Sequence, residues 1–400
     1  MAWDAATTSI PASWSSRCGG SKMKTLAIYL TGACNLRCKH CSVGFDQYRP
    51  RQALTDDDII RVLDRARERE VEFITFLGGE PFYSPHDLPR IFGHAEALGI
   101  NVSVNTNLFF YERLEELFGY TSLQNVVVSV DGASAESHDA MRGKGSFERT
   151  VGNLRKLVKT RNALRPDITI DVTFALSDLN RRDNLKMFRL AEDIGIDCLN
   201  VNIVQPIGRA GKFRQRVMGD DAGYIEALAQ IFIYFLASKP AFKLSVPIPP
   251  AVAAFINQTY AVPMEVFTNE RMCGGTSVYT YVDLMGNLLP CPGLSYEEGR
   301  NSLMNRRQSR LSIVDHKISE IEESSLFQAF ETARKTHSKN ALFDPCNRCA
   351  FSDRCSPCTS AYYKTGADLE ISLCKRVSNL VAESGEQFSV FKQTDLSESF

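Results

Sequence analysis

The cysteines are the residues with the greatest chemical potential, and the 400-residue chain has twelve of them. Gaps of two to five residues separate most neighbours within the groups that they form. No basic start followed by an apolar stretch marks an export signal, and clustered cysteines in a reducing cytosol usually bind metal. The spacing therefore predicts metal centres rather than disulfides. The groups are Cys34, Cys38 and Cys41; Cys273 and Cys291; and Cys346, Cys349, Cys355 and Cys358, with Cys374 close behind.

The first group has the spacing C-x3-C-x2-C, which can bind three irons of a 4Fe–4S cubane and leave the fourth without a protein ligand. An amino acid can chelate that iron through its amine and carboxylate. An electron from the cluster can then break the carbon–sulfur bond of an adjacent sulfonium. The alternative is a zinc site or a ferredoxin site, which needs a fourth ligand, and His40 is the nearby candidate.

A second motif, Gly78-Gly79-Glu80-Pro81, follows the next predicted strand. Glycines let the backbone approach a ligand closely, and a carboxylate accepts hydrogen bonds from an ammonium group. The two motifs together resemble the radical SAM superfamily, whose members use S-adenosylmethionine (SAM). The resemblance implies that Cys34, Cys38 and Cys41 hold the catalytic cluster, that the GGEP segment contacts the SAM amino group, and that His40 packs near the adenine.

Three further strand ends look like counterparts of the family's SAM contacts. The resemblance implies that Ser129 or Asp131 reaches the ribose hydroxyls and that Arg209 lies close to SAM, where a guanidinium suits its carboxylate. Strand-end capping remains the alternative for Asn105 and Ser129, and a structural ion pair for Arg209. The expected SAM contacts are His40, Gly78, Gly79, Glu80, Pro81, Asn105, Ser129, Asp131 and Arg209.

The later cysteines resemble the SPASM domain, which carries two auxiliary Fe–S clusters on seven cysteines. Cys355 and Cys358 are separated by two residues where that family commonly has three. A zinc ribbon is the alternative, since four-cysteine zinc sites use similar spacing. Cys18 and Cys198 are expected to be ordinary thiols, with Cys198 buried. The resemblance implies one cluster on Cys346, Cys349, Cys355 and Cys374, and another on Cys273, Cys291 and Cys358 without an evident fourth cysteine.

Positioning these motifs requires a sheet of parallel strands. From residue 25 to about 205, nearly continuous apolar runs alternate with helix-like segments, which predicts right-handed βαβ units. The alternation alone allows an open sheet or a curled one. The resemblance implies a partial (β/α)6 TIM-like barrel in the α/β class, with the motifs at the carboxyl ends of the strands. The predicted strands are Leu26–Thr31, Glu72–Leu77, Asn101–Thr106, Asn125–Val130, Ile168–Leu176 and Cys198–Val204.

Helix-start signals lie between these strands. Thr55 can cap a helix while Leu54 packs on Ile59, and Ser146 begins another helix. The segment Ser84–Asp87 predicts a helix with Pro85 at its first position. The domains expected from these patterns are an N-terminal extension (1–24), a radical SAM core (25–211), a connecting region (212–270), a SPASM auxiliary-cluster domain (271–380) and a tail (381–400).

Composition limits the partners. The formal net charge is −1, so overall charge recruits neither nucleic acid nor an anionic membrane. The most apolar window, Tyr224–Ser238, is short for a membrane span and contains Glu226 and Gln230, which predicts a buried helix. We therefore expect a soluble, cytoplasmic protein.

The resemblance implies an oxidoreductase-type radical SAM enzyme. Such an enzyme cleaves SAM reductively to a 5′-deoxyadenosyl radical, which abstracts a hydrogen atom from a substrate. The favoured substrate is a ribosomally synthesised precursor peptide that undergoes crosslinking, epimerisation or oxidation. Oxidation of a small molecule such as a sugar or amino alcohol is one alternative, and a non-catalytic Fe–S electron carrier is another. A ferredoxin or flavodoxin is the expected electron donor, and a separate leader-peptide-binding protein is a possible partner.

Overall fold

The computed structural model describes residues 25–41, 54–204, 208–264, 275–276, 279–294, 310–337, 345–352, 355, 373–384, 388 and 390. Within these residues nine strands form one sheet in the order β7-β6-β5-β4-β3-β2-β1-β8-β9. All neighbouring pairs are parallel except β8 and β9. The strands are β1 (Thr25–Thr31), β2 (Phe73–Gly78), β3 (Asn101–Thr106), β4 (Leu123–Ser129), β5 (Thr169–Leu176), β6 (Cys198–Ile203), β7 (Lys243–Ser245), β8 (Tyr279–Val282) and β9 (Leu288–Leu289).

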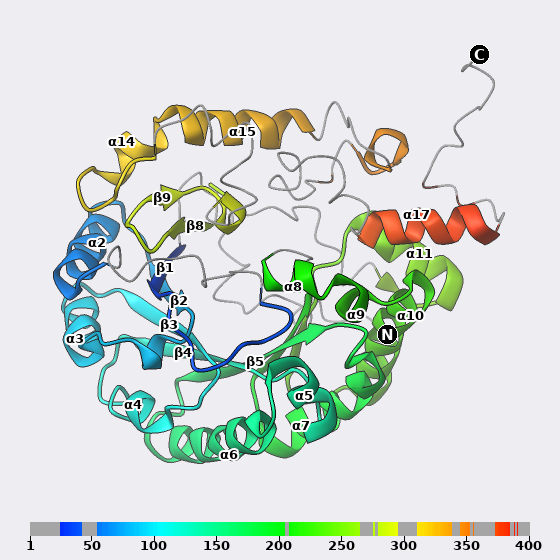
Figure 1. Cartoon of the computed structure of the whole chain (residues 1–400), viewed down its shortest axis with the longest axis horizontal. Coiled ribbons are helices and arrows are strands. Elements are labelled where there is room, and N and C mark those ends of the chain that lie inside the picture. Colours follow the sequence, from blue (N-terminus) through cyan, green and yellow to red (C-terminus); the bar gives the residue numbers. More distant parts are fainter. Residues whose placement is uncertain are drawn as a thin grey trace, which may run out of the picture.

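The sheet curves into a partial barrel with helices on its outer side (Figure 1). This confirms the predicted α/β fold class, and each of the six predicted strands is present with its ends within two residues. The helices of the barrel are α2 (Asp56–Glu68), α3 (Leu88–Ala97), α4 (Tyr111–Glu115), α5 (Ala135–Arg142), α6 (Ser146–Leu164), α7 (Asn184–Ile194), α8 (Arg209–Lys212), α9 (Arg214–Met218), α10 (Asp221–Ser238) and α11 (Pro250–Tyr260).

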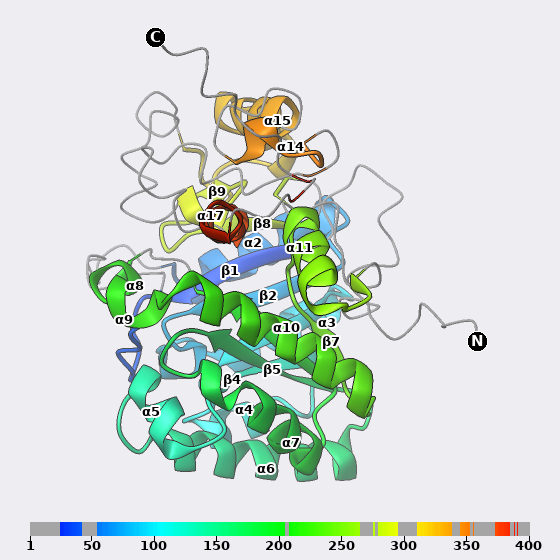
Figure 2. The ribbon, with the colours of Figure 1, turned by 90° about the vertical axis from the view of Figure 1, so that its right-hand side faces the viewer.

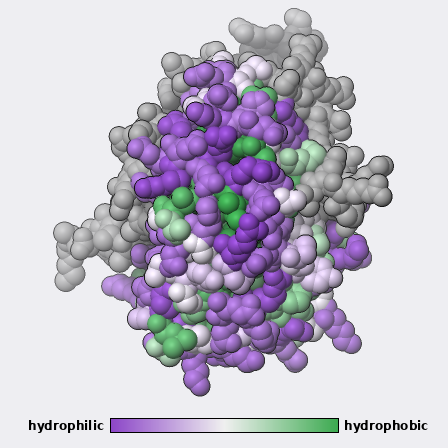
Figure 3. Space-filling view, turned by 90° about the vertical axis from the view of Figure 1, so that its left-hand side faces the viewer, coloured by the Kyte–Doolittle hydropathy of each residue, from purple (hydrophilic) through white to green (hydrophobic). Residues whose placement is uncertain are grey.

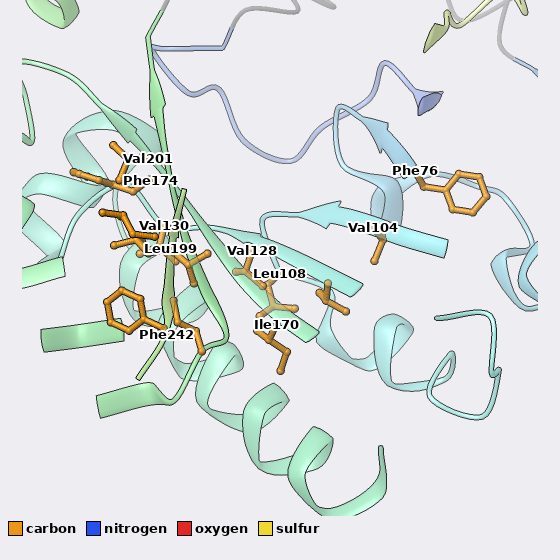
Figure 4. Packing of buried hydrophobic residues seen from close by; sticks show 14 of the residues in the cluster. Phe76, Val104, Leu108, Val128, Val130, Ile170, Phe174, Leu199, Val201 and Phe242 are labelled. Carbon is orange, nitrogen blue, oxygen red and sulfur yellow. The ribbon is translucent and has the colours of Figure 1, made fainter. Parts of the chain in front are cut away.

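The core lies between the sheet and this helical layer. Alternate residues of each strand point outward, and those of the central strands are mostly Val, Ile, Leu and Phe with almost no exposure. Figure 4 shows part of this packing, with Val128 of β4, Ile170 of β5 and Leu199 of β6 in one cluster. The outer surface seen in Figure 3 is largely hydrophilic, with small hydrophobic patches. In the described part of the chain, no helix combines the length and apolar character needed to cross a membrane.

Two of the three predicted helix starts are confirmed. Thr55 caps α2 through a reciprocal pair of hydrogen bonds with Asp58, and α6 begins at Ser146. The helix expected at Pro85 is wrong, because α3 begins at Leu88 with Asp87 as its cap. The physical reason is the guanidinium of Arg113, which donates to the carbonyls of residues 82, 84 and 86 and so holds the chain before Leu88 out of the α-helical conformation.

The described C-terminal residues contact the barrel through β8 and helix α17 (Leu373–Ser384), and also through an ion pair between Glu322 and Arg69. β8 pairs with β1 and so extends the sheet beyond the six predicted strands. Helix α17 lies against α10, and its buried Arg376 donates to Met218 O and to the Asp221 carboxylate. Helices α14 (Ile318–Glu322) and α15 (Ser325–His337) lie above the β8 and β9 hairpin (Figures 1 and 2).

Candidate active site

The loop after β1 brings the first three cysteines together around a pocket at the carboxyl ends of the strands. The pocket has a volume of about 510 Å³, and Cys34, Cys38 and Cys41 all line it. Among the described residues, no three Cys, His, Asp or Glu side chains are gathered tightly enough to hold one metal ion. The three thiols thus line one pocket, and their C-x3-C-x2-C spacing suits a 4Fe–4S cluster.

Close backbone packing fixes this loop against the end of β2. The amide of Gly79 donates to Thr31 O at 2.7 Å, and the amide of Glu80 donates to Ala33 O at 2.9 Å. A Cβ atom on Gly79 would lie 2.0 Å from Ala33 O, and Gly78 has a φ of +153°. Only glycine therefore permits this approach, which gives the two glycines a geometric role in forming the pocket.

The three cysteines of this loop are partly buried. Burial raises the pKa of Cys34, and burial raises the pKa of Cys38 to about 12 against the opposing charge of Arg142. Metal ligation requires thiolates, and a bound cation deprotonates a coordinating thiol outright. These residues thus fit a metal cluster, because its charge would compensate the burial that otherwise keeps the thiols neutral.

Glu80 lies behind the pocket wall, with 1 % of its surface exposed. Its carboxylate accepts hydrogen bonds from Thr106 Oγ1 (2.7 Å), the Asn107 amide (2.7 Å) and the Phe82 amide (3.2 Å). Burial raises the pKa of Glu80 to about 7, although these three donors oppose the rise. The carboxylate therefore holds two pocket-lining residues, and Asn107 in turn donates to Asn35 Oδ1 at 2.8 Å in the cysteine loop.

A buried charged network lies on the other side of the cysteines. The Asp131 carboxylate is fully buried and accepts from Arg142 Nε at 2.5 Å and from the Ala175 amide at 2.8 Å. His40 Nε2 lies 3.4 Å from the same carboxylate. Burial lowers the pKa of His40 to about 4, and its buried Nδ1 has no hydrogen-bond partner among the described residues. The His40 residue itself lines the pocket.

Some of the other residues predicted to contact SAM line the pocket, and the rest lie behind its wall. Arg209 lines the pocket, its amide donates to Cys41 O at 2.9 Å, and its Nη1 lies 3.5 Å from Cys38 O. Pro81 begins the short 3-10 helix Pro81–Tyr83 and is buried. The residues predicted from the sequence that line the pocket are Cys34, Cys38, Cys41, His40, Gly78, Gly79, Asn105, Ser129 and Arg209, whereas Glu80, Pro81 and Asp131 lie behind it.

Sequence reasoning missed several lining residues: Tyr83, Thr106, Asn107 and Arg142. Thr106 and Asn107 directly follow the predicted Asn105, so the end of β3 was itself a signal for them. Arg142 ends α5, eleven residues after Asp131, and only the α5 helix brings it back to the cysteine loop. No local sequence pattern indicates that return.

The predicted ligands of one auxiliary cluster, Cys346, Cys349, Cys355 and Cys374, are all partly buried. The charges of Cys346, Cys355 and Cys349 raise the pKa of Cys374, after the larger effect of its burial. A hydrogen bond from Arg348 to Ser378 Oγ, at 2.6 Å, connects this region to α17. Cys291 packs instead beside the cluster of Leu289, Leu294, Leu326 and Phe330. Cys273, Cys358 and Cys18 lie outside the described residues, and Cys198 is buried in β6 as expected.

A partial α/β barrel with three cysteines after its first strand and a glycine pair after its second defines a class of SAM-dependent Fe–S enzymes. Residues 28–191 match the model of the Radical SAM superfamily. The chain therefore carries a radical SAM domain at residues 28–191, which confirms the resemblance seen in its motifs. This family implies a 4Fe–4S cluster and SAM.

Relatives extend the likeness beyond that domain. The AdoMet-dependent heme synthase of Methanosarcina barkeri is 27% identical over 87% of this chain and 94% of its own length. The mycofactocin maturase MftC of Mycolicibacterium smegmatis is 28% identical over 66% of this chain and 62% of its own. The crystal structure of Streptococcus suis SuiB bound to the precursor peptide SuiA has a TM-score of 0.67 at 15% identity, covering 89% of this chain and 76% of SuiB, which shows a shared fold.

Proposed function

We propose that this protein is a radical SAM enzyme that modifies a precursor peptide, with its catalytic cluster on Cys34, Cys38 and Cys41. Three thiols around one pocket, and a glycine pair whose Cβ atoms would collide with the cysteine loop, support this placement. When bound, the cluster supplies the electron that cleaves SAM to methionine and a 5′-deoxyadenosyl radical, which removes a hydrogen atom from the substrate.

The protein's own residues position SAM and exclude water. In this proposal the backbone of Gly78 and Gly79 forms the floor under the SAM amino group. Glu80 fixes Thr106 and Asn107 beside it through two of its three hydrogen bonds. The imidazole of His40 would pack against the adenine, and the guanidinium of Arg209 would offer a positive charge to the carboxylate of SAM.

One observation carries the substrate proposal: a row of neutral polar side chains runs across the inner face of the barrel. Ser129 lines the pocket, and its cross-strand neighbours are Thr173 on β5, then Asn200 on β6, then Ser245 on β7. Cross-strand partners point to the same face of a sheet, and all four side chains are partly exposed. A peptide backbone, with donors and acceptors at every residue, can pair with such a row.

A second candidate is a reaction on a haem-type tetrapyrrole. The identity to the Methanosarcina barkeri heme synthase extends over 94% of that protein, and this observation favours it. A tetrapyrrole is flat and largely apolar, with anionic carboxylates at its edge. Beyond the pocket, the row of Thr173, Asn200 and Ser245 offers hydroxyl and amide groups rather than an apolar surface or cations, so we rank the peptide first.

The proposal extends to the C-terminal cysteines. We assign one auxiliary Fe–S cluster to Cys346, Cys349, Cys355 and Cys374, supported by the electrostatic interaction of these four thiols. A further cluster would use Cys273, Cys291 and Cys358. These clusters would relay an electron from the substrate radical or bind the substrate. A ferredoxin or flavodoxin would supply the first electron, and a leader-peptide-binding protein would present the peptide.

The experiment that tests the substrate class compares two probes on one preparation. Reconstituted enzyme, SAM and dithionite are incubated with a pool of short peptides encoded beside its gene, or with an iron porphyrin. The proposal predicts that a peptide loses hydrogen or gains a crosslink by mass spectrometry, and that Asn200→Leu reduces this product more than 5′-deoxyadenosine release. Product from the porphyrin alone would favour the second candidate.

A further inference from the structure

A fixed cation lies directly behind the cysteine loop. Arg142 is the last residue of α5, and its side chain is 8% exposed. Its Nε donates to Asp131 Oδ2 at 2.5 Å, and its Nη1 lies 3.9 Å from Cys38 Sγ, within reach of an N–H···S hydrogen bond. One thiol of the proposed cluster site therefore faces a buried guanidinium, which itself faces a buried carboxylate.

Further hydrogen bonds hold this pair rigidly against the loop. The Lys39 amide donates to Met141 O at 2.8 Å, and Lys39 Nζ donates to Ala140 O at 2.5 Å, which ties the last turn of α5 to the segment between Cys38 and Cys41. Asn180 Nδ2 donates to Asp131 O at 2.9 Å. The distance from the guanidinium to the Cys38 thiol is thus set by the fold rather than by a flexible side chain.

We infer that Arg142 and Asp131 are positioning residues of opposite sign that set the reduction potential of the cluster on the cysteine loop. The inference rests on the proposed function, because it needs that cluster. Reduction adds one negative charge to the cluster. A nearby cation stabilises the reduced form and raises the potential, whereas a nearby carboxylate lowers it. Both effects are strong here because the pair is buried in low dielectric.

Arg142 also lines the pocket, so a contact with SAM is the competing role. The two roles make different predictions for the protein without SAM. A residue that acts only on SAM leaves the potential of the SAM-free cluster unchanged. A residue that acts on the cluster shifts that potential whether or not SAM is present.

The test is a redox titration followed by electron paramagnetic resonance, on anaerobically reconstituted full-length protein without SAM. The signal of interest is the one that is lost in Cys34→Ala. We expect Arg142→Gln to reduce the ratio of reduced to oxidised cluster at a fixed ambient potential about tenfold, which for a one-electron couple is about 59 mV. Asp131→Asn should move the ratio in the opposite direction, and Arg142→Lys should give a smaller shift than Arg142→Gln.

Arg149→Gln is the matched control, because Arg149 is exposed and bonds to Phe109 O rather than to the cysteine loop. Its titration should match the wild type. Unchanged potentials, or shifts of the same sign in Arg142→Gln and Asp131→Asn, overturn the inference. If the Arg142→Gln protein does not bind iron, the Asp131→Asn protein alone decides. The inference is then overturned if the reduction potential of the Asp131→Asn cluster is not raised. A wild-type protein without any signal that depends on Cys34 would instead refute the proposed cluster site.

Discussion

Replacing Glu80 by Gln perturbs the carboxylate that supports the pocket wall, and the structure predicts a change that depends on pH. Burial raises the pKa of Glu80 from 4.5 to about 7. The native carboxyl group therefore binds its proton more tightly than the unfolded one. Its contribution to stability is fully present below pH 4.5 and is lost as the pH rises through about 7.

The magnitude follows from these two pKa values. Between pH 6 and pH 8 the wild type should lose about 1 kcal/mol of unfolding free energy through this group. Glu80→Gln cannot titrate, so it should lack this slope. It should also leave one buried donor unpaired, because the Gln amide cannot accept from both Thr106 and the Asn107 amide, at a cost of about 1–3 kcal/mol. The variant should therefore be less stable than the wild type at pH 6, by a margin that narrows at pH 8.

Anaerobic urea unfolding of the reconstituted proteins, followed by circular dichroism at pH 6 and pH 8, measures this difference. Glu136→Gln is the control, since Glu136 is exposed on α5 and should leave the wild-type slope intact. SAM affinity, measured on the same samples, should fall in Glu80→Gln while the cluster absorbance is retained. An identical pH slope in wild type and Glu80→Gln would refute the reasoning.

Three further predictions follow from individual contacts. Gly79→Ala should prevent assembly of the cluster on the cysteine loop, because the new Cβ would lie 2.0 Å from Ala33 O. The readout is the iron content per chain. Gly152→Ala, which adds a Cβ in open space on α6, is the control and should retain the iron. The Cys346→Ala variant should still release 5′-deoxyadenosine when dithionite is supplied, but it should make no product from the substrate. A normal yield of product would mean that the auxiliary cluster serves folding alone. Arg376→Met removes the buried guanidinium that donates to the Asp221 carboxylate and to Met218 O. The free energy of unfolding, measured in urea, should fall by about 3 kcal/mol. A fall of less than about 1 kcal/mol would contradict this prediction.

The strands and the first pocket residues could be predicted because their signals are local. Several of the six core strands are nearly continuous apolar runs, and the cysteine and GGEP motifs lie at the carboxyl ends of the first two. Long-range contacts carried no such signal. The false helix start at Pro85 arose because Arg113, on α4, bonds to the carbonyls around it. The sequence around Pro85 has the pattern of a helix start, and only the fold brings Arg113 next to it.

The lack of a sequence signal for long-range contacts also explains which site residues were predicted incompletely. Glu80 was expected to contact SAM, yet its carboxylate is directed at Thr106 and Asn107, which β3 places beside it. Arg142 went unpredicted because its partners, Cys38 and Asp131, come from other elements. Residue types and spacing thus predict which groups meet at the strand ends. Which of them face the pocket and which stand behind it depends on packing that the spacing does not contain.

The most direct test of the central claim is the iron and SAM chemistry of a protein in which Cys34, Cys38 and Cys41 are all replaced by Ala. Cys198→Ala, which removes a buried thiol outside the groups, is the control. The triple variant should lose about four irons per chain and all dithionite-dependent release of 5′-deoxyadenosine, while retaining the iron of the C-terminal cysteines. Zinc without iron in the anaerobically purified wild type, or undiminished SAM cleavage by the triple variant, would contradict the claim.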